Sequence, residues 1–286
     1  MLNSHTVLTG LFGHPVGHSL SPVMHNRAFN VCGLNYRYAA FDIQPERVGS
    51  AVDAIRALGI RGVNVTVPHK ISVIPYLDEI DEEAALIGAV NTIVNENGRL
   101  VGYNTDGRGY VRSLVEESGI NVRKQSAVMI GAGGGARGVA VALLQAGLPS
   151  LVIVNRSVDK AKQLAEDIKH VNPSSVVHTV VPGDIPDVIK ESTLLIQTTS
   201  VGMHPNVLET PLAPELLHEG MLVSDLVYNP LQTKLLQEAH NRGARTHGGL
   251  GMLIYQGALS FEYWTGIKAP VDEMRAAAMK ELEKRS

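Results

Sequence analysis

A run of glycines between a strand pattern and a helix pattern restricts the possible folds of this chain more than any other feature. Gly131-Ala132-Gly133-Gly134-Gly135-Ala136 follows the apolar stretch Ser126–Ile130 and opens a segment of small residues. In a strand–loop–helix unit of this type, Gly131 makes the tight turn, Gly133 lets a pyrophosphate approach, and Ala136 lets the helix pack on the strand. A phosphate bound there faces the positive end of the helix. The loop therefore predicts a dinucleotide site, the alternative being a flexible glycine-rich turn.

The segments on either side of the loop alternate between strand and helix patterns. After the loop, strand patterns separated by segments of helix length recur at Leu151–Asn155, Val176–Val180, Leu194–Gln197 and Met221–Leu226. Such repeated strand–helix–strand units predict a parallel sheet covered by helices on both faces. Before the loop, Asn97-Gly98 predicts a two-residue hairpin turn. Ser21-Pro22 predicts an N-cap followed by proline at the first position of a helix.

The strand that follows the loop ends in residues that favour NADP over NAD. Asn155-Arg156-Ser157 stands where an NAD site usually has an acidic residue for the ribose, and Lys160 follows one turn later. A guanidinium can bind a 2′-phosphate through two hydrogen bonds, whereas a carboxylate repels it. The alternative is a solvated loop arginine, and the nearby Asp159 slightly weakens the case for phosphate binding. We predict NADP as the cofactor.

The composition is typical of a globular protein that acts on small molecules. Of the 286 residues, 44% are hydrophobic and 19% are charged, which excludes wholesale disorder. The net charge of −3 gives no reason to expect nucleic acid as a partner, and the single cysteine, Cys32, favours a reducing compartment. The N-terminus has no secretory pattern, and no apolar stretch reaches the ~18 residues of a membrane span. We therefore expect a cytoplasmic protein without membrane contact.

The sequence does not support a metal site or a covalent nucleophile. His14, His18, His25 and His69 occur close together in the chain, but their spacing matches no metal motif. Neither a G-x-S-x-G pattern nor a Cys/His nucleophile pair appears. Cys32 falls in a predicted helix and is expected to be a core residue.

Several motifs in a fixed order carry a resemblance to a known family. Before the loop the chain contains Gly13-x-Pro15-Val16-x-His18-Ser19-Leu20-Ser21-Pro22, Gly62-Val63-Asn64-Val65-Thr66-Val67-Pro68-His69-Lys70, Gly88-Ala89-Val90-Asn91-Thr92 and Tyr103-Asn104-Thr105-Asp106-Gly107. After it come Gln197-Thr198-Thr199-Ser200-Val201-Gly202-Met203, Asp225-Leu226-Val227-Tyr228-Asn229-Pro230 and Gly251-Met252-Leu253-Ile254-Tyr255-Gln256-Gly257-Ala258. Together these motifs resemble the shikimate dehydrogenase family over nearly the whole chain. Gly135, Ser157 and the Gln197-Thr198-Thr199 segment depart mildly from the family pattern, at expected cofactor contacts.

The resemblance implies an α/β fold with two domains. An N-terminal α/β substrate-binding domain would span residues 1–105 and be completed by C-terminal helices in residues 251–286. A Rossmann-type domain with a doubly wound parallel sheet would bind NADP with residues 106–250. The implied activity is the reversible NADPH-dependent reduction of 3-dehydroshikimate to shikimate, a step toward chorismate and the aromatic amino acids. The resemblance leaves both a monomer and a homodimer open.

The resemblance also implies roles for individual residues. Hydride transfer to a ketone leaves charge on the oxygen, so a proton donor must stand beside it; Lys70 would be that donor, paired with Asp106. Ser19 and Ser21 would bind the substrate carboxylate, although Ser21 could instead be only an N-cap. The ring hydroxyls would contact Asn64, Thr66, Asn91, Asp106, Tyr228 and Gln256, although Asn64 could instead be a buried amide that braces its loop. The cofactor would contact the glycine loop from Gly131 to Ala136 together with Asn155, Arg156, Ser157, Lys160, Thr199, Leu226, Gly249 and Met252.

Two other functions are left open by the sequence. The same carboxylate and diol contacts would serve quinate, so a quinate/shikimate dehydrogenase with relaxed substrate or cofactor choice is one alternative. The other is a catalytically silent, nucleotide-sensing homologue, although the presence of both Lys70 and Asp106 argues against it. An absorbance assay at the nicotinamide band distinguishes an enzyme from a binding protein.

Overall fold

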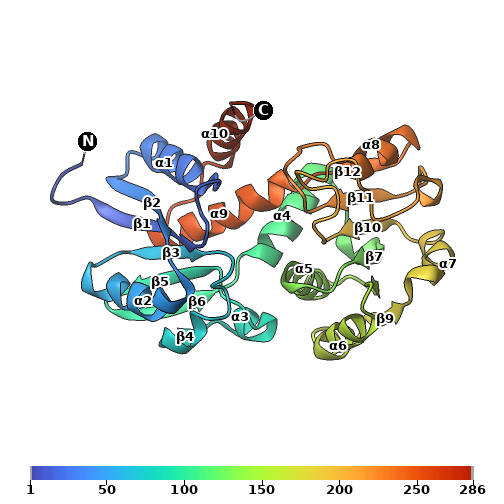
Figure 1. Ribbon diagram of the computed structural model, residues 1–286, viewed down its shortest axis with the longest axis horizontal. Helices are drawn as coiled ribbons and strands as arrows, with labels where there is room; N and C mark the ends of the chain where they lie inside the picture. Colours follow the sequence, from blue (N-terminus) through green and yellow to red (C-terminus); the bar gives the residue numbers. More distant parts are fainter. Residues whose placement is uncertain (1, 285–286) are drawn as a thin grey trace. The chain divides into compact units, whose positions relative to one another are not determined.

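The computed structural model describes residues 2–284, which form two compact units (Figure 1). The first unit joins the chain up to Thr105 with the segment from Ile254 onward, and the second unit spans Asp106–Leu253. Each unit is built around a six-stranded sheet. Among the described residues, no helix is long and apolar enough to cross a membrane.

The sheet of the first unit mixes parallel and antiparallel strands. Its strands are β1 Val7–Gly13, β2 Tyr36–Asp42, β3 Gly62–Val65, β4 Glu79–Ile80, β5 Thr92–Glu96 and β6 Arg99–Tyr103. They lie in the order β2-β1-β3-β5-β6-β4, with β1 parallel to β2 and β3, and β5 antiparallel to β3 and β6. The predicted hairpin turn is confirmed: Asn97 and Gly98 join β5 to β6 with φ angles of 55° and 98°.

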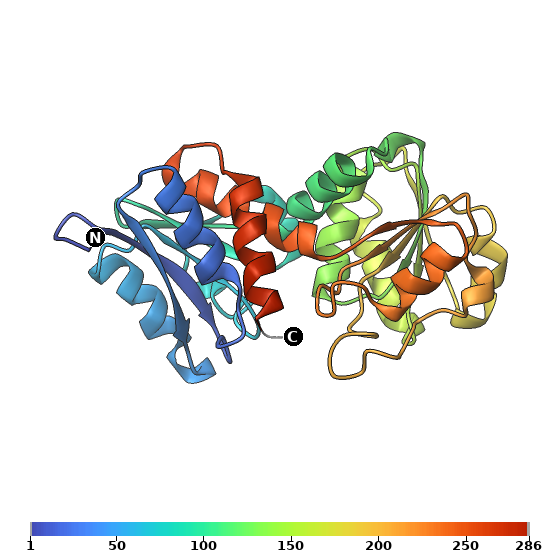
Figure 2. The same cartoon turned by 90° about the horizontal axis from the view of Figure 1, so that it is seen from above.

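Helices from both ends of the chain pack on this sheet. They are α1 Ser21–Val31, α2 Val48–Ala57, α3 Glu82–Ile87 and α10 Val271–Glu283, while α9 Leu250–Thr265 begins in the second unit and ends in the first. α1 and α10 lie side by side, although most of the chain separates them in sequence (Figure 2). The C-terminal segment therefore completes the core of the first unit.

The start of α1 corrects the predicted N-cap. Leu20 is the N-cap and Ser21 is the first helical residue, so Pro22 occupies the second helical position and not the first. Proline is tolerated there because the N–H groups of the first turn have no partner within the helix. The hydroxyl that serves the helix start is that of Ser19, whose Oγ accepts a hydrogen bond from Ser21 N–H at 3.2 Å. Gly33, with a φ of 66°, follows the helix end as expected.

The sheet of the second unit is fully parallel, as predicted. Its strands are β7 Ser126–Ile130, β8 Ser150–Val154, β9 Val176–Val180, β10 Leu194–Gln197, β11 Leu222–Asp225 and β12 Arg245–His247, in the order β12-β11-β10-β7-β8-β9. The strand order reverses between β7 and β10, the point at which open parallel sheets bind their ligands. The sequence did not predict β12, because Arg245-Thr246-His247 has no apolar pattern.

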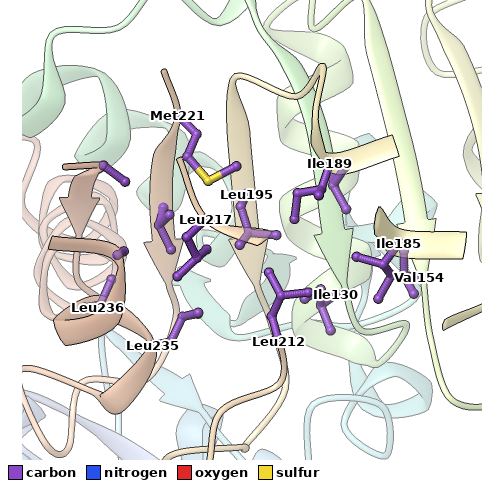
Figure 3. Close-up of a cluster of buried hydrophobic side chains, with 14 of the residues drawn as sticks. Ile130, Val154, Ile185, Ile189, Leu195, Leu212, Leu217, Met221, Leu235 and Leu236 are labelled. Carbon is purple, nitrogen blue, oxygen red and sulfur yellow. The ribbon is translucent and has the colours of Figure 1, made fainter. Parts of the chain in front are cut away.

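The helices of the second unit cover both faces of its sheet. They are α4 Asp106–Ser118, α5 Gly134–Gln145, α6 Val158–Ile168, α7 Ile185–Ile189 and α8 Lys234–Asn241. α4 packs against α5, and α5 packs against α6. On the other face, Ile185 and Ile189 of α7 and Leu235 and Leu236 of α8 are buried in one apolar cluster (Figure 3). The strands contribute Ile130, Val154 and Leu195 to this cluster. Each such side chain contributes about 1.5–3 kcal/mol by leaving water, so this core holds the loops at the strand ends.

A histidine without hydrogen bonds lies in the core of the first unit. His25, on α1, is fully buried, and neither ring nitrogen has a hydrogen-bond partner among the described residues. Its ring stacks on that of Tyr38, with centroids 4.5 Å apart and an interplanar angle of 5°. Burial lowers the pKa of His25 to about 3, and the neighbouring Asn64 amide opposes this with a smaller effect.

We expect this ring to make the protein less stable at acid pH. The unfolded chain protonates His25 near pH 6.5 and the folded chain only near pH 3, so its contribution is complete above pH 6.5 and is lost as the pH falls toward 3. From pH 7 to pH 4.5 the loss from this residue should be about 2–3 kcal/mol. Urea unfolding of His25→Phe, which keeps a stacked ring, should show a correspondingly smaller loss between these pH values than the wild type.

A control variant uses an exposed histidine. His170→Ala should lose as much stability between pH 7 and pH 4.5 as the wild type does, because His170 lies at the surface. The same loss in His25→Phe and in the wild type would contradict the assignment of the acid sensitivity to His25.

Candidate active site

Polar residues that the sequence singles out in the first unit lie at the edge of the sheet where the parallel strands β1 and β3 have their carboxyl ends. β1 and β3 are parallel and end at this edge, where Thr66 N–H donates to Phe12 O at 2.9 Å. β5 is antiparallel to β3, so Asn91, just before β5, lies at the same edge, and its carbonyl oxygen accepts from Val65 N–H at 2.7 Å. This is the edge at which parallel strands present their carboxyl ends, where open sheets bind ligands.

Lys70 is held at this edge by its own main chain. The segment after β3 forms a turn in which His69 N–H donates to Thr66 O at 2.8 Å. Lys70 O then accepts from Val90 N–H, also at 2.8 Å. The His69 ring is buried, and its Nε2 lies 2.7 Å from Ile43 O, just beyond β2. These hydrogen bonds fix the backbone of Lys70, whose side chain is half-buried.

Ser19 and Ser21 stand at the start of α1, which follows β1. Ser21 is buried, at 6% exposure, and Ser19 is half-buried. Because Ser19 Oγ accepts the Ser21 N–H, the Ser19 hydroxyl keeps its own proton for another acceptor. Two hydroxyls at the N-terminus of an eleven-residue helix are suited to a carboxylate, since the helix dipole also favours negative charge there.

Asn64 is surrounded by protein groups of the first unit. It is 4% exposed, and its Oδ1 accepts from the Tyr38 hydroxyl at 2.8 Å. Its Nδ2 donates to Ser260 Oγ at 2.8 Å and to Thr92 Oγ1 at 3.1 Å. The side-chain amide thus has partners on both its oxygen and its nitrogen, and it braces β3 against β2, β5 and α9.

The glycine loop lies at the carboxyl end of β7 in the second unit. Gly131 has a φ of 120°, and a Cβ there would come within 2.2 Å of Thr198 Oγ1, so only glycine fits. α5 begins at Gly134 with Gly133 as its N-cap, and a Cβ on either glycine would meet nothing within 4 Å. The space beside the start of α5 is therefore open at these two glycines, and the N-terminus of a helix favours a phosphate.

No acidic side chain stands directly at the carboxyl end of β8. Asn155, Arg156 and Ser157 follow this strand, and Ser157 is the N-cap of α6. Asn155 Nδ2 donates to Ser157 O at 3.0 Å and holds the turn. Arg156 is exposed, and neither Arg156 nor Asp159 forms an ion pair in the described part of the chain. The guanidinium is therefore accessible to a phosphate, with the exposed Lys160 one turn further along.

The carboxyl ends of β10, β11 and β12 bring further candidate residues to the same edge of the second sheet. Gln197 Oε1 accepts from both N and Oγ1 of Thr199 at 3.0 Å, which fixes the Thr199 loop. Leu226 follows β11, and a Cβ on Gly249 would lie 2.2 Å from Leu226 O. The Leu226 side chain also reaches the glycine loop, with its Cδ2 3.9 Å from the Cβ position of Gly135.

Asp225 braces the loop that carries Tyr228. It is 1% exposed, and its carboxylate accepts from Val227 N–H at 3.0 Å and from Thr233 Oγ1 at 2.7 Å. Burial raises the pKa of Asp225 to about 6, although both hydrogen bonds lower it. The stability that this group contributes therefore grows as the pH falls from 6 to 3.8, opposite in sign to the effect of His25.

Asp106 is the first residue of α4, and this helix has a fixed place in the second unit. A Cβ on Gly107 would lie 2.2 Å from a carbonyl oxygen of α5, so the two helices touch at the start of α4. Further along, Ser113 Oγ lies 2.8 Å from His247 Nε2, and His247 Nδ1 lies 2.9 Å from Ser224 Oγ. These buried polar contacts tie α4 to β11 and β12 and so position the backbone of Asp106.

A cavity of about 700 Å³ in the first unit lies away from these residues. It opens at the amino ends of β1 and β3, beside the hairpin turn, and is lined by Arg56, Arg61 and residues 95–98 among others. Arg61 donates to the carbonyl oxygens of Trp264 at 2.9 Å and Asn95 at 2.5 Å, so it caps the end of α9. Across residues 2–284, no cluster of three or more His, Cys, Asp or Glu side chains could hold a metal ion.

Comparison with known proteins places the chain in a family. The shikimate dehydrogenase substrate binding domain matches residues 11–93, the shikimate / quinate 5-dehydrogenase family matches residues 113–220, and the shikimate 5′-dehydrogenase C-terminal domain matches residues 249–279. A shikimate dehydrogenase (NADP+) of Geobacillus kaustophilus is 50% identical over 275 residues, which cover 96% of this chain and 98% of that protein. The chain belongs to the shikimate dehydrogenase (NADP+) family.

Solved structures of shikimate dehydrogenases share the fold of both units. One, in complex with NADP+, matches with a TM-score of 0.91 and 46% identity, covering 98% of this chain and 97% of that one. Another, from Thermus thermophilus, in complex with NADP(H) and shikimate, matches with a TM-score of 0.87 and 38% identity, covering 96% and 99%. The resemblance to the shikimate dehydrogenase family and the expected α/β fold with a Rossmann-type sheet are both confirmed.

Sequence reasoning assigned roles to residues at the carboxyl ends of the strands but not to the hydroxyl residues behind them. Tyr38, Thr92, Thr105 and Ser260 are buried hydroxyl residues around Asn64 and Asn91, and the sequence assigned a role to none of them. Thr92 and Thr105 lie inside the family motifs, whereas Tyr38 and Ser260 lie outside them. For Ser260, a hydroxyl between apolar neighbours was the available signal, since a buried polar group needs a partner.

Proposed function

We propose that the chain catalyses the reversible, NADPH-dependent reduction of 3-dehydroshikimate to shikimate, with Lys70 and Asp106 in proton transfer. One observation carries the residue assignments: the register of the first sheet collects an ammonium, hydroxyls and an amide at one edge, from Ser19, Ser21, Thr66, Lys70 and Asn91. A ligand with one carboxylate and several ring oxygens complements this set of donors.

The substrate is oriented by its carboxylate and its ring oxygens. Ser19 and Ser21 bind the carboxylate at the start of α1, and Thr66, Asn91 and Gln256 bind ring oxygens. Tyr228 and Asp106 are the remaining proposed substrate contacts. Binding energy from these non-reacting groups holds the carbonyl carbon in position for reaction.

Lys70 supplies the proton in the reductive direction. As negative charge develops on the carbonyl oxygen, the Lys70 ammonium stabilises it and transfers a proton from Nζ, which yields the hydroxyl of shikimate. In the oxidative direction the neutral Lys70 amine takes the hydroxyl proton back. Asp106 acts on Lys70 by charge, since a carboxylate favours and orients an ammonium.

The residues of the second unit fit NADP. The space beside Gly133 and Gly134 is open, and Arg156 is exposed at the end of β8, where no carboxylate would repel a 2′-phosphate. When bound, the cofactor supplies the hydride. Thr199, Leu226, Gly249 and Met252 then form the remaining contacts, together with Asn155, Ser157 and Lys160.

The two units divide these tasks. We assign residues 1–105, completed by 251–286, to substrate binding and residues 106–250 to NADP binding; the compact units meet in sequence at Thr105/Asp106 and Leu253/Ile254. Shikimate and 3-dehydroshikimate are the expected small-molecule partners, and no part of the proposal requires nucleic acid or a membrane. A single cysteine supports a cytoplasmic location.

Removing either serine hydroxyl should weaken shikimate binding. We expect Ser19→Ala and Ser21→Ala each to cost roughly 0.5–1.5 kcal/mol, rising to about 3 kcal/mol where the bond reaches a charged carboxylate. Ser19→Ala should also lower thermal stability slightly, because the Ser21 N–H loses its partner. The measurements are KM for shikimate and Tm, with Ser50→Ala on the exposed side of α2 as the control. Unchanged KM in both variants would make the pair structural.

A substrate panel tests the proposed function as a whole. Purified protein is assayed at the nicotinamide absorbance band with shikimate and with quinate, each with NADP+ and with NAD+. We expect the highest kcat/KM for shikimate with NADP+. Comparable or better values with quinate would favour the quinate/shikimate alternative, and no turnover with any pair would favour a nucleotide-sensing protein.

A further inference from the structure

Tyr38 lies in a buried polar chain that the proposed reaction does not use. It is the third residue of β2 and is 4% exposed, and its hydroxyl donates to Asn64 Oδ1 at 2.8 Å. Burial raises the pKa of the Tyr38 phenol, which keeps the hydroxyl protonated. The hydroxyl is therefore a donor toward Asn64.

The chain continues from Asn64 to Asn91 with its donors in one direction. Asn64 Nδ2 donates to Thr92 Oγ1 at 3.1 Å, and the Thr92 hydroxyl donates to Asn91 Oδ1 at 3.0 Å. Ser260 Oγ lies 2.8 Å from both Asn64 Nδ2 and Thr92 Oγ1, and its hydroxyl donates to Gln256 O at 3.0 Å. Hydrogen bonds aligned in this way polarise one another in a low-dielectric interior.

The last link determines which way the Asn91 amide faces. Asn91 Oδ1 accepts from Thr105 N–H at 2.8 Å in addition to the Thr92 hydroxyl, so both lone pairs of the oxygen are used. A flipped amide would place its NH2 group against the Thr105 N–H, donor against donor. In the proposed function Asn91 therefore meets a substrate oxygen only as a donor through Nδ2, which also donates to Thr105 Oγ1 at 3.0 Å. A donor suits both redox states of the ring, because ketone and hydroxyl oxygens both accept.

We propose that Tyr38 is a positioning residue for substrate recognition, acting on Asn91 through Asn64 and Thr92. This inference rests on the proposed function, which assigns Asn91 to a ring oxygen. Tyr38, like the residues through which it acts, belongs to the first unit. Its loss should therefore affect recognition of shikimate and leave recognition of NADP unchanged.

The test compares two phenols on the same strand. Tyr38→Phe keeps the ring stacked on His25 and removes only the hydroxyl. Tyr36→Phe removes a hydroxyl two residues away, from a ring that packs on Phe29 with centroids 5.1 Å apart. We expect Tyr38→Phe to raise KM for shikimate roughly 3–10-fold, with KM for NADP+ unchanged and kcat affected less than KM. Tyr36→Phe should match the wild type in all three.

A second pair tests the same chain at Thr92 and covers the case in which Tyr38→Phe does not fold. Thr92→Val removes the donor to Asn91 and should raise KM for shikimate by a similar factor, while Thr92→Ser should restore it. If both residues act through Asn91, Tyr38→Phe/Thr92→Val should raise KM by less than the product of the single effects. A rise equal to that product would overturn the connected chain.

The remaining outcomes separate this inference from the proposed function. If the wild type oxidises shikimate but Tyr38→Phe and Thr92→Val lower only Tm, with KM as in Tyr36→Phe, the chain is structural and the inference is overturned. If the wild type turns over no shikimate, the proposed function fails, and calorimetric shikimate binding to the same variants decides the inference. No binding by the wild type would overturn both.

Discussion

Replacing Lys70 by alanine should lower kcat for shikimate oxidation by roughly 10²–10⁴-fold, because the reacting hydroxyl loses the group that takes its proton. KM for shikimate should change much less, since the serine, threonine and amide contacts of the first unit remain. Steady-state kinetics with NADP+ at saturating concentration separate the two constants. A near-normal kcat in Lys70→Ala would overturn the assignment.

Two further variants show whether the proton or only the charge of Lys70 matters. Lys70→Arg keeps a cation, but a guanidinium stays protonated in proteins and cannot take up the hydroxyl proton. Its kcat should therefore stay close to that of Lys70→Ala. Lys268→Ala, on the exposed turn after α9 in the same unit, should keep the wild-type kcat. Full activity in Lys70→Arg would mean that charge stabilisation alone accounts for the role of Lys70.

Replacing Arg156 by alanine should reduce the preference for NADP+ over NAD+ by roughly 10–100-fold or more. A hydrogen bond to a charged phosphate is worth about 1.5–3 kcal/mol, and each 1.4 kcal/mol is about a tenfold change. NAD+ has no 2′-phosphate, so its weak activity should be unaffected. Lys160 and Ser157 stand on the same side of the β8 end and could keep part of the site. The measurement is kcat/KM for both cofactors in the wild type and the variant.

The control is an arginine at the other end of the second sheet. Arg123 is exposed just before β7, away from the carboxyl ends of the strands, and Arg123→Ala should leave the cofactor preference unchanged. Equal losses with NADP+ and NAD+ in Arg156→Ala would mean that Arg156 holds the loop or the adenine and does not read the phosphate. A wild type that prefers NAD+ would overturn the role of Arg156 in cofactor choice outright.

Prediction from sequence was most accurate in the second unit. The bounds of β7, β9 and β10 agree with the predicted segments, because buried parallel strands appear as short apolar runs. The first unit was predicted less completely. Its hairpin was expected from Asn97-Gly98, but the two-residue strand β4 and the short helix α3 were not, since segments of this length carry too few residues to show a period.

Local sequence was sufficient for the glycine loop, the parallel sheet, the family resemblance and the absence of an acid after β8, because each depends on residues that are neighbours in the chain. It was insufficient for the partners of buried polar groups. Tyr38, Asn64, Thr92 and Ser260 meet through strand register and the return of α9, across up to 222 residues of sequence. Register depends on the packing of whole sheets, so the direction in which Asn91 donates and the burial of His25 and Asp225 emerged only from the folded structure.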